Sequence, residues 1–215
     1  MFGGATMKKD ERKLTEKELK RKEYFEKLSA EMQEKGYQAK DLTVSILQAN
    51  VAAFFIMLPF MAVAAWVFYI VNSTGAQGLS LELGLLLLPL LLVLIVLHEL
   101  IHGITWGIFA KNHFHSIDFG IVWSALTPYC TCSEPMKKWQ YILGSAMPTL
   151  LLGGGTAAVA AATGQLLLLF LSELMILSGG GDFLIILKIL FYRSGKKETV
   201  YYDHPYECGV VVFEK

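Results

Sequence analysis

The sequence has 215 residues, of which 54% are hydrophobic, and its mean hydropathy is +0.46. This is more apolar than an ordinary soluble domain, and the formal net charge of zero gives no overall field that would attract nucleic acid. The composition therefore favours a membrane protein and argues against a nucleic-acid-binding one.

Residues 1–43 predict a cytoplasmic N-terminal helix. Residues 1–41 carry eleven Lys/Arg and nine Asp/Glu, which is more than half of all charged residues. Thr15 and Glu18 have the spacing of a capping box, and Gly36 is a typical helix stop. We expect a helix that is solvated or lies on the membrane surface, with the binding of a partner as the alternative.

A core of residues 44–193 follows, with four apolar stretches. Each stretch is long enough to cross a bilayer, which takes about 20 apolar residues. The predicted spans are about 50–71, 83–110, 141–162 and 166–192. The sequence therefore predicts an all-α polytopic membrane protein with about four transmembrane helices.

The loop 111–138 has a different periodicity. Ile117, Phe119, Ile121 and Trp123 alternate with other residues, as in a strand, and TPYCTC at 127–132 is a candidate partner. We expect a small cytoplasmic β-hairpin there. The cytoplasmic tail, 194–215, also has the composition of strands.

Basic residues predict the orientation in the cell membrane. Four crossings place both termini on one side, and the loops on the other side, 72–82 and 163–165, contain no Lys or Arg. Basic residues flank the remaining connections, at Lys111, Lys137, Lys138, Arg193, Lys196 and Lys197. By the positive-inside rule, both termini are cytoplasmic.

Three ionisable residues interrupt the second span, which reads VLIVLHELIHGITWGIF at 93–109. His98 and His102 are four apart, so on a helix they share one face and can bind one zinc ion. Glu99 lies on a neighbouring face, as in the H-E-x-x-H arrangement of zinc metallopeptidases. A charge at the centre of a span costs about 2.5–3.5 kcal/mol, which favours a functional site over polar residues that merely bond to neighbouring helices.

A catalytic zinc ion usually has a third protein ligand. The candidates are His113, His115, Asp118, Glu134, Glu173 and Asp182. The expected depth in the membrane favours Asp182. Asp182 lies eleven positions before Arg193, the basic residue that follows its span. Residue 100, midway between the two histidines, likewise lies eleven positions before Lys111. The glycines at 179–181 allow the backbone to bend toward the metal, although close helix packing is an alternative reason for them.

The combination resembles the intramembrane metalloproteases of the site-2 protease type. More narrowly, the sequence is similar to a family of small bacterial membrane proteins described as zincin peptidases. The matching segments are HELIHG at 98–103, EPMKKW at 134–139, LGSAMPTLLLG at 143–153, GGGD at 179–182 and DHPYECG at 203–209. The resemblance covers roughly residues 45–210, and Phe183 stands where site-2 proteases typically have glycine after the aspartate.

This resemblance implies a Zn²⁺ cofactor held by His98, His102 and Asp182, with Glu99 as the general base. It also implies a peptide or membrane-protein substrate, which must unwind locally before hydrolysis. The predicted hairpin could pair with the unwound segment through an edge strand, or could cap the cytoplasmic mouth of the site. Cys130 and Cys132 are expected to be reduced structural thiols, and the role of Glu173 stays open.

Two functions without proteolysis are alternatives. A metal transporter can carry a related motif, but the first and third spans here have almost no ligands. A membrane scaffold could hold zinc structurally, but such a site has no need of a base at Glu99.

Overall fold

The computed structural model describes residues 14–76, 78, 80–122 and 127–215. Residues 1–13 of the predicted N-terminal segment, and Trp123 of the predicted hairpin, lie outside these residues. The helices are α1 (Glu16–Glu34), α2 (Ile46–Val71), α3 (Leu81–Phe109), η1 (His113–Ser116), α4 (Lys138–Pro148), η2 (Thr149–Gly154), α5 (Gly155–Thr163), α6 (Leu166–Ser178) and α7 (Gly180–Phe191). The strands are β1 (Gln38–Asp41), β2 (Ile117–Val122), β3 (Thr127–Cys132), β4 (Thr199–Asp203) and β5 (Val210–Glu214).

In the part of the chain that the structure describes, three helical stretches are long and apolar enough to cross a membrane, namely 48–71 of α2, 84–109 of α3, and 138–163. The last of these combines α4, the π-helix η2 and α5. Helices α6 and α7 form a fourth candidate, bent by 41° where they meet. The four predicted spans thus correspond to these candidates, and the bend falls at the predicted glycines.

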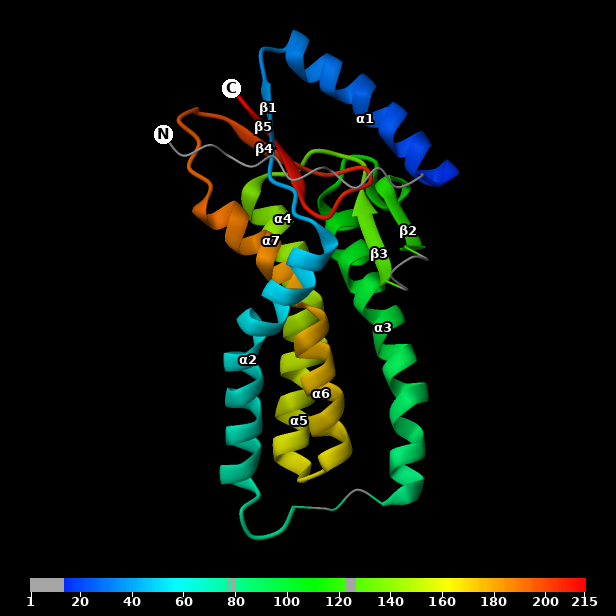
Figure 1. The fold of residues 1–215 in the computed structure, drawn as a ribbon, viewed down its shortest axis with the longest axis vertical. Coiled ribbons are helices and arrows are strands. Elements are labelled where there is room, and N and C mark those ends of the chain that lie inside the picture. Colours follow the sequence, from blue (N-terminus) through cyan, green and yellow to red (C-terminus); the bar gives the residue numbers. More distant parts are fainter. Residues whose placement is uncertain (1–13, 77, 79, 123–126) are drawn as a thin grey trace.

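Helices α2, α3, α5 and α6 lie side by side along the long axis of the molecule (Figure 1). The labelled strands and α1 lie at one end, called here the strand-bearing end, and the end of α2, the start of α3, the end of α5 and the start of α6 lie at the other. Large apolar side chains point outward from the helices; Phe55, Trp66 and Leu85 are 65%, 62% and 70% exposed. Exposed apolar surface of this extent suits a lipid environment, where a helix satisfies its own backbone hydrogen bonds.

The strand-bearing end contains a three-stranded antiparallel sheet in the order β1-β5-β4. The central strand β5 is buried throughout, and Phe213 packs with Met32 of α1 and Tyr202 of β4. The capping box of α1 is present as predicted, with Thr15 Oγ1 accepting from the N–H of Glu18. The sheet joins a segment that precedes the helical core in the sequence to two that follow it.

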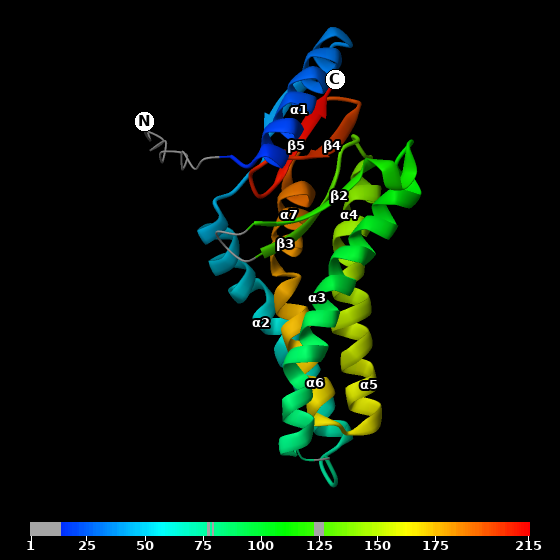
Figure 2. The ribbon, with the colours of Figure 1, turned by 90° about the vertical axis from the view of Figure 1, so that its right-hand side faces the viewer.

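The predicted hairpin is present over its described residues, with Phe119 opposite Cys130 and Ile121 opposite Pro128. It lies beside the upper part of α3 and below α1 (Figures 1 and 2). Gly103 allows this close approach, because a Cβ there would lie 2.5 Å from Phe119 Cζ. The packing brings β3 next to the turn of α3 that carries the predicted site.

Candidate metal centre

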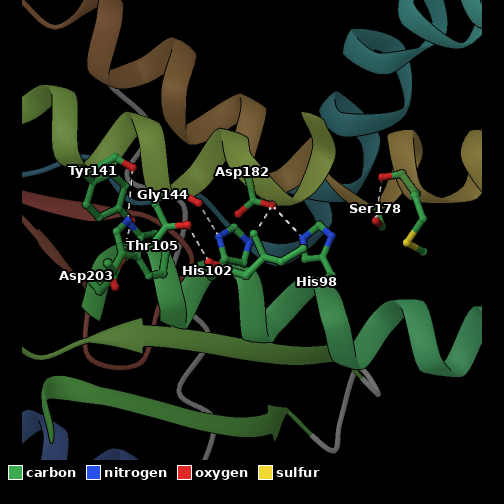
Figure 3. A network of polar contacts seen from close by, with 11 residues as sticks. His98, His102, Thr105, Tyr141, Gly144, Ser178, Asp182 and Asp203 are labelled. Atoms are coloured by element: carbon green, nitrogen blue, oxygen red, sulfur yellow. Dashed lines mark hydrogen bonds and ion pairs between the residues drawn. The ribbon is translucent and has the colours of Figure 1, made fainter. Parts of the chain in front are cut away.

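His98 and His102 lie on one face of α3, as their spacing predicts. Their ring centroids are 4.9 Å apart, and the residues are only 6% and 3% exposed. Both rings turn toward α7 (Figure 3). Because burial removes these two imidazoles from water, they need polar partners within the protein.

Asp182 supplies that partner from the first turn of α7. The start of α7 packs closely against η2 and α2. A Cβ at Gly179 would lie 1.7 Å from Thr149 Oγ1 of η2, and one at Gly180 would lie 2.5 Å from Ala53 Cβ of α2. Only glycine permits such contacts without displacing a helix. The glycines at the bend therefore allow the start of α7, which carries Asp182, to pack closely against η2 and α2.

The three side chains converge with separations that suit zinc. His98 Nε2 and His102 Nε2 lie 3.3 Å and 3.4 Å from Asp182 Oδ2. A tetrahedral ion with ligands at about 2.0–2.1 Å holds its ligand atoms about 3.3–3.4 Å apart. The ligand atoms of all three residues lie within 4.8 Å of one another, so the donor set can hold one ion.

Hydrogen bonding fixes the tautomer of His102. Its Nδ1 lies 2.8 Å from the carbonyl oxygen of Gly144 in α4. A carbonyl can only accept, so Nδ1 carries the proton and Nε2 of the neutral ring has a lone pair. This backbone support is typical of histidines that bind metals through their other nitrogen.

As a result, two acceptors face each other at the centre of the site. The lone pair of a neutral His102 Nε2 meets a carboxylate oxygen of Asp182 3.4 Å away. A cation must lie between them to make this contact favourable: either a second proton on the ring or a metal ion. The site therefore fits the ion that the H-E-x-x-H sequence predicts.

Glu99 occupies the next position on α3 and is half-buried. The backbone N–H of Cys130 in β3 donates to its carboxylate. The carboxylates of Glu99 and Asp182 also interact electrostatically, as do Glu99 and both histidines. The structure thus places the predicted base beside the ligand group, held by the hairpin.

The other sequence candidates do not join this group. His113, His115 and Asp118 are exposed at η1 and β2. Glu134 accepts hydrogen bonds from the N–H groups of Lys111 and Asn112 and from Ser116 Oγ. Although burial opposes its ionisation, these donors hold the pKa of Glu134 below its usual value.

Glu173 and the cysteines also lie outside the ligand group. Glu173 Oε1 is buried in α6 and has no hydrogen-bond partner among the described residues. Cys130, Cys132 and Cys208 are free thiols. Burial raises the pKa of Cys132 to about 12, so this thiol stays protonated at neutral pH and is a poor metal ligand.

A chain of contacts leads from His102 to the C-terminal tail, which sequence reasoning does not predict. Trp106 stacks on His102 with a centroid distance of 5.0 Å, and its Nε1 donates to the Tyr141 carbonyl. The Tyr141 hydroxyl donates to Asp203, which also accepts the N–H of Cys132. The only sequence signal for Asp203 is its place in the DHPYECG segment.

A second group of three possible ligands is present among the described residues. It comprises Asp41, His204 and Glu207, and its ligand atoms also lie within 4.8 Å of one another. The group joins the end of β1 to the turn between β4 and β5, outside the helical core. His204 Nδ1 there accepts the backbone N–H groups of Glu207 and Tyr206.

Comparison with known proteins supports a zinc peptidase. Residues 91–196, just under half of the chain, match the model of a family described as "Putative zincin peptidase". This segment contains His98, Glu99, His102 and Asp182, and the family description implies a zinc cofactor. No curated protein and no solved structure matches the chain.

Proposed function

We propose that this chain is a zinc-dependent peptidase that hydrolyses peptide bonds within or beside a membrane, in the manner of site-2 proteases. One observation carries the proposal. Asp182 Oδ2, a carboxylate oxygen that can only accept hydrogen bonds, lies 3.3 Å from His98 Nε2 and 3.4 Å from His102 Nε2. His98, His102 and Asp182 would hold the ion. The zincin family match over the same segment supports this assignment.

When bound, the zinc ion supplies a Lewis acid and makes a water acidic enough to lose a proton near pH 7. Glu99 accepts a proton from the attacking water as the water oxygen bonds to the scissile carbonyl carbon. Glu99 then gives that proton to the amide nitrogen as the C–N bond breaks. The hydrogen bond from the Cys130 N–H restrains the Glu99 carboxylate for both transfers.

The proposed core, 44–193, spans the bilayer with its strand-bearing end in the cytoplasm. Basic residues lie next to the helix ends at this end of the molecule: Lys111 follows α3, Lys137 precedes α4 and Arg193 follows α7. The positive-inside rule assigns that side to the cytoplasm. A C-terminal green fluorescent protein fusion should fluoresce and a C-terminal alkaline phosphatase fusion should be inactive; the reverse pair of results would overturn the orientation.

The hairpin offers one edge to an unwound substrate. The N–H groups of Cys130 and Cys132 donate to Glu99 and Asp203, so they point away from β2. In an antiparallel pair, hydrogen-bonded and non-hydrogen-bonded residue pairs alternate. The residues of β2 whose N–H groups point away from β3 are therefore Ile117, Phe119 and Ile121. The outward edge of β2 is therefore the one we propose for substrate pairing.

Ile121 tests this substrate edge. Ile121→Pro removes an outward N–H while sparing the bonds between β2 and β3, so cleavage should be abolished and zinc binding retained. Ile121→Ala is the matched control and should cleave normally. Normal cleavage by the proline variant would show that the hairpin is a cap instead of a substrate partner.

Zinc transport receives less support from the structure. Among the described residues, the only other group of possible ligands is Asp41, His204 and Glu207, at the strand-bearing end. A transporter needs a route of polar sites through both leaflets. No second group of this kind lies within the helices as described.

The decisive experiment compares purified wild type with Glu99→Gln in zinc content and cleavage. The probes are labelled casein and single-span peptides in phosphatidylcholine–phosphatidylglycerol vesicles. We expect about one zinc ion per chain in both proteins, and cleavage that falls by about 10²–10⁴-fold in Glu99→Gln. Equal cleavage by both proteins would overturn the role of Glu99, and zinc flux into vesicles without cleavage would favour transport.

A further inference from the structure

The Gly144 carbonyl that holds His102 is freed by a proline. In a regular α-helix this carbonyl would accept the N–H of residue 148, four positions later. Residue 148 is proline, which has no N–H. The next N–H along the chain, that of Thr149, is bonded to the Ala146 carbonyl.

The local backbone keeps this carbonyl available. The helix changes from α to π immediately after Pro148, over Thr149–Gly154. Gly144 is buried, and a buried carbonyl without a hydrogen-bond partner is destabilising. The Nδ1–H of His102, 2.8 Å away, supplies the missing donor from the neighbouring helix α3.

Glycine at position 144 makes the approach of the two helices possible. A Cβ on Gly144 would lie 1.9 Å from Nε1 of Trp106, the residue that stacks on His102. Trp106 therefore holds one face of the His102 ring. The Gly144 carbonyl holds its Nδ1 (Figure 3). Both restraints direct Nε2 toward Asp182.

We propose that Pro148 is a positioning residue for His102: it removes the helical donor to the Gly144 carbonyl and so reserves that carbonyl for Nδ1. The effect of Pro148 on metal binding rests on the proposed function. The hydrogen bond between His102 Nδ1 and the Gly144 carbonyl is independent of that function. The other histidine gives a contrast, since His98 Nδ1 is buried without a hydrogen-bond partner among the described residues. Of the two histidines, only His102 therefore has its tautomer fixed by a backbone carbonyl of the described residues.

Pro148→Ala tests the proposal because it restores an N–H that competes for the Gly144 carbonyl. Loss of backbone support for a metal-binding histidine typically costs about 10–100-fold in affinity, so we expect zinc affinity to fall by that factor. Full occupancy should return at high zinc. Pro89→Ala, which restores the same kind of bond to the exposed Leu85 in α3, is the matched control and should bind zinc like wild type.

Two further readouts separate positioning from a merely structural role. The melting temperature of the zinc-free protein should be equal or higher in Pro148→Ala, because alanine suits a helix interior better than proline. In zinc-free protein labelled with ¹⁵N-histidine, the exchange-protected Nδ1–H signal of His102 should be present in wild type and lost in Pro148→Ala. His102→Gln assigns that signal.

The outcomes distinguish this proposal from the proposed function. Unchanged zinc affinity with an unchanged His102 signal in Pro148→Ala would overturn the role of Pro148 and leave the peptidase proposal standing. A lower melting temperature with normal affinity would likewise overturn it, in favour of a structural role. Wild type that binds no zinc would overturn the proposed function, and the His102 signal would then decide the role of Pro148 alone.

Discussion

Two groups of described residues each place three possible metal ligands within 4.8 Å of one another, yet their histidines differ in which ring nitrogen has a lone pair. In the helical core, His102 Nδ1 donates to a carbonyl, which leaves Nε2 free to bind a cation. At the strand-bearing end, His204 Nδ1 accepts the backbone N–H groups of Glu207 at 2.9 Å and Tyr206 at 3.4 Å. A neutral His204 then carries its proton on Nε2, so neither nitrogen offers a free lone pair.

The difference shows that proximity of ligand atoms does not by itself define a metal site. The backbone groups around each histidine decide which nitrogen has a lone pair. By this criterion, the group of Asp41, His204 and Glu207 is a clasp between β1 and the turn after β4. Asp41 has a backbone partner of its own, because Oδ1 accepts the N–H of Thr43 at 2.8 Å.

The largest effect should come from removing a carboxylate from each group. Asp182→Ala removes one of three ligands and leaves the two imidazoles without their anionic partner, so zinc affinity should fall at least about 100-fold. Glu207→Ala, the matched change in the clasp, should bind zinc like wild type. Isothermal titration with zinc in detergent micelles measures both. Equal affinity in Asp182→Ala and wild type would remove Asp182 from the site.

A smaller effect concerns Asp203, which lies next to the clasp in sequence and contacts the core through Tyr141. Burial raises the pKa of Asp203 to about 6, so the folded protein binds a proton more tightly than the unfolded chain. The stabilising contribution is complete below about pH 4 and disappears as the pH rises through 6. Between pH 4.5 and 7 this residue should lower the melting temperature by roughly 5 °C.

Asp203→Asn supplies the control for this pH dependence. The amide does not titrate, so this part of the slope between pH 4.5 and 7 should vanish even if the variant is less stable at every pH. Thermal unfolding in detergent, followed by circular dichroism, measures the slope. A slope identical to that of wild type would show that another group titrates in this range.

The smallest effect is expected at the clasp. His204→Ala removes the acceptor for two backbone N–H groups, which should cost about 1–2 kcal/mol of stability. Zinc content and cleavage should remain those of wild type, because the clasp lies outside the helical core. A loss of zinc from His204→Ala would mean that the second group binds metal after all.

Much of the core follows from patterns that are local in the sequence. Apolar runs of more than 20 residues predict the spans, since hydrocarbon favours helices that satisfy their own backbone. The spacing of His98 and His102 predicts a shared helix face, and the position of Asp182 before Arg193 predicts its depth. In the structure the three side chains lie together, as helix geometry alone predicts, whereas the crossing of a bilayer and the depth of the site stay predictions.

Other features depend on contacts between distant segments and leave weak signals. The strand β1, with the sequence QAKD, is short, charged and exposed, so nothing in its composition indicates that it pairs with the buried β5. The Gly144 carbonyl belongs to the backbone and has no residue type to recognise. Its one signal is Pro148, which becomes meaningful only when α4 is known to lie against α3.

Zinc-edge X-ray absorption of the purified wild type and Asp182→Ala tests the central claim most directly. The account predicts nitrogen and oxygen ligands at about 2.0–2.1 Å in wild type, two of them with the scattering signature of imidazole. One light ligand should be lost or replaced in Asp182→Ala. Sulfur ligands at about 2.3 Å, or identical spectra for the two proteins, would contradict the account.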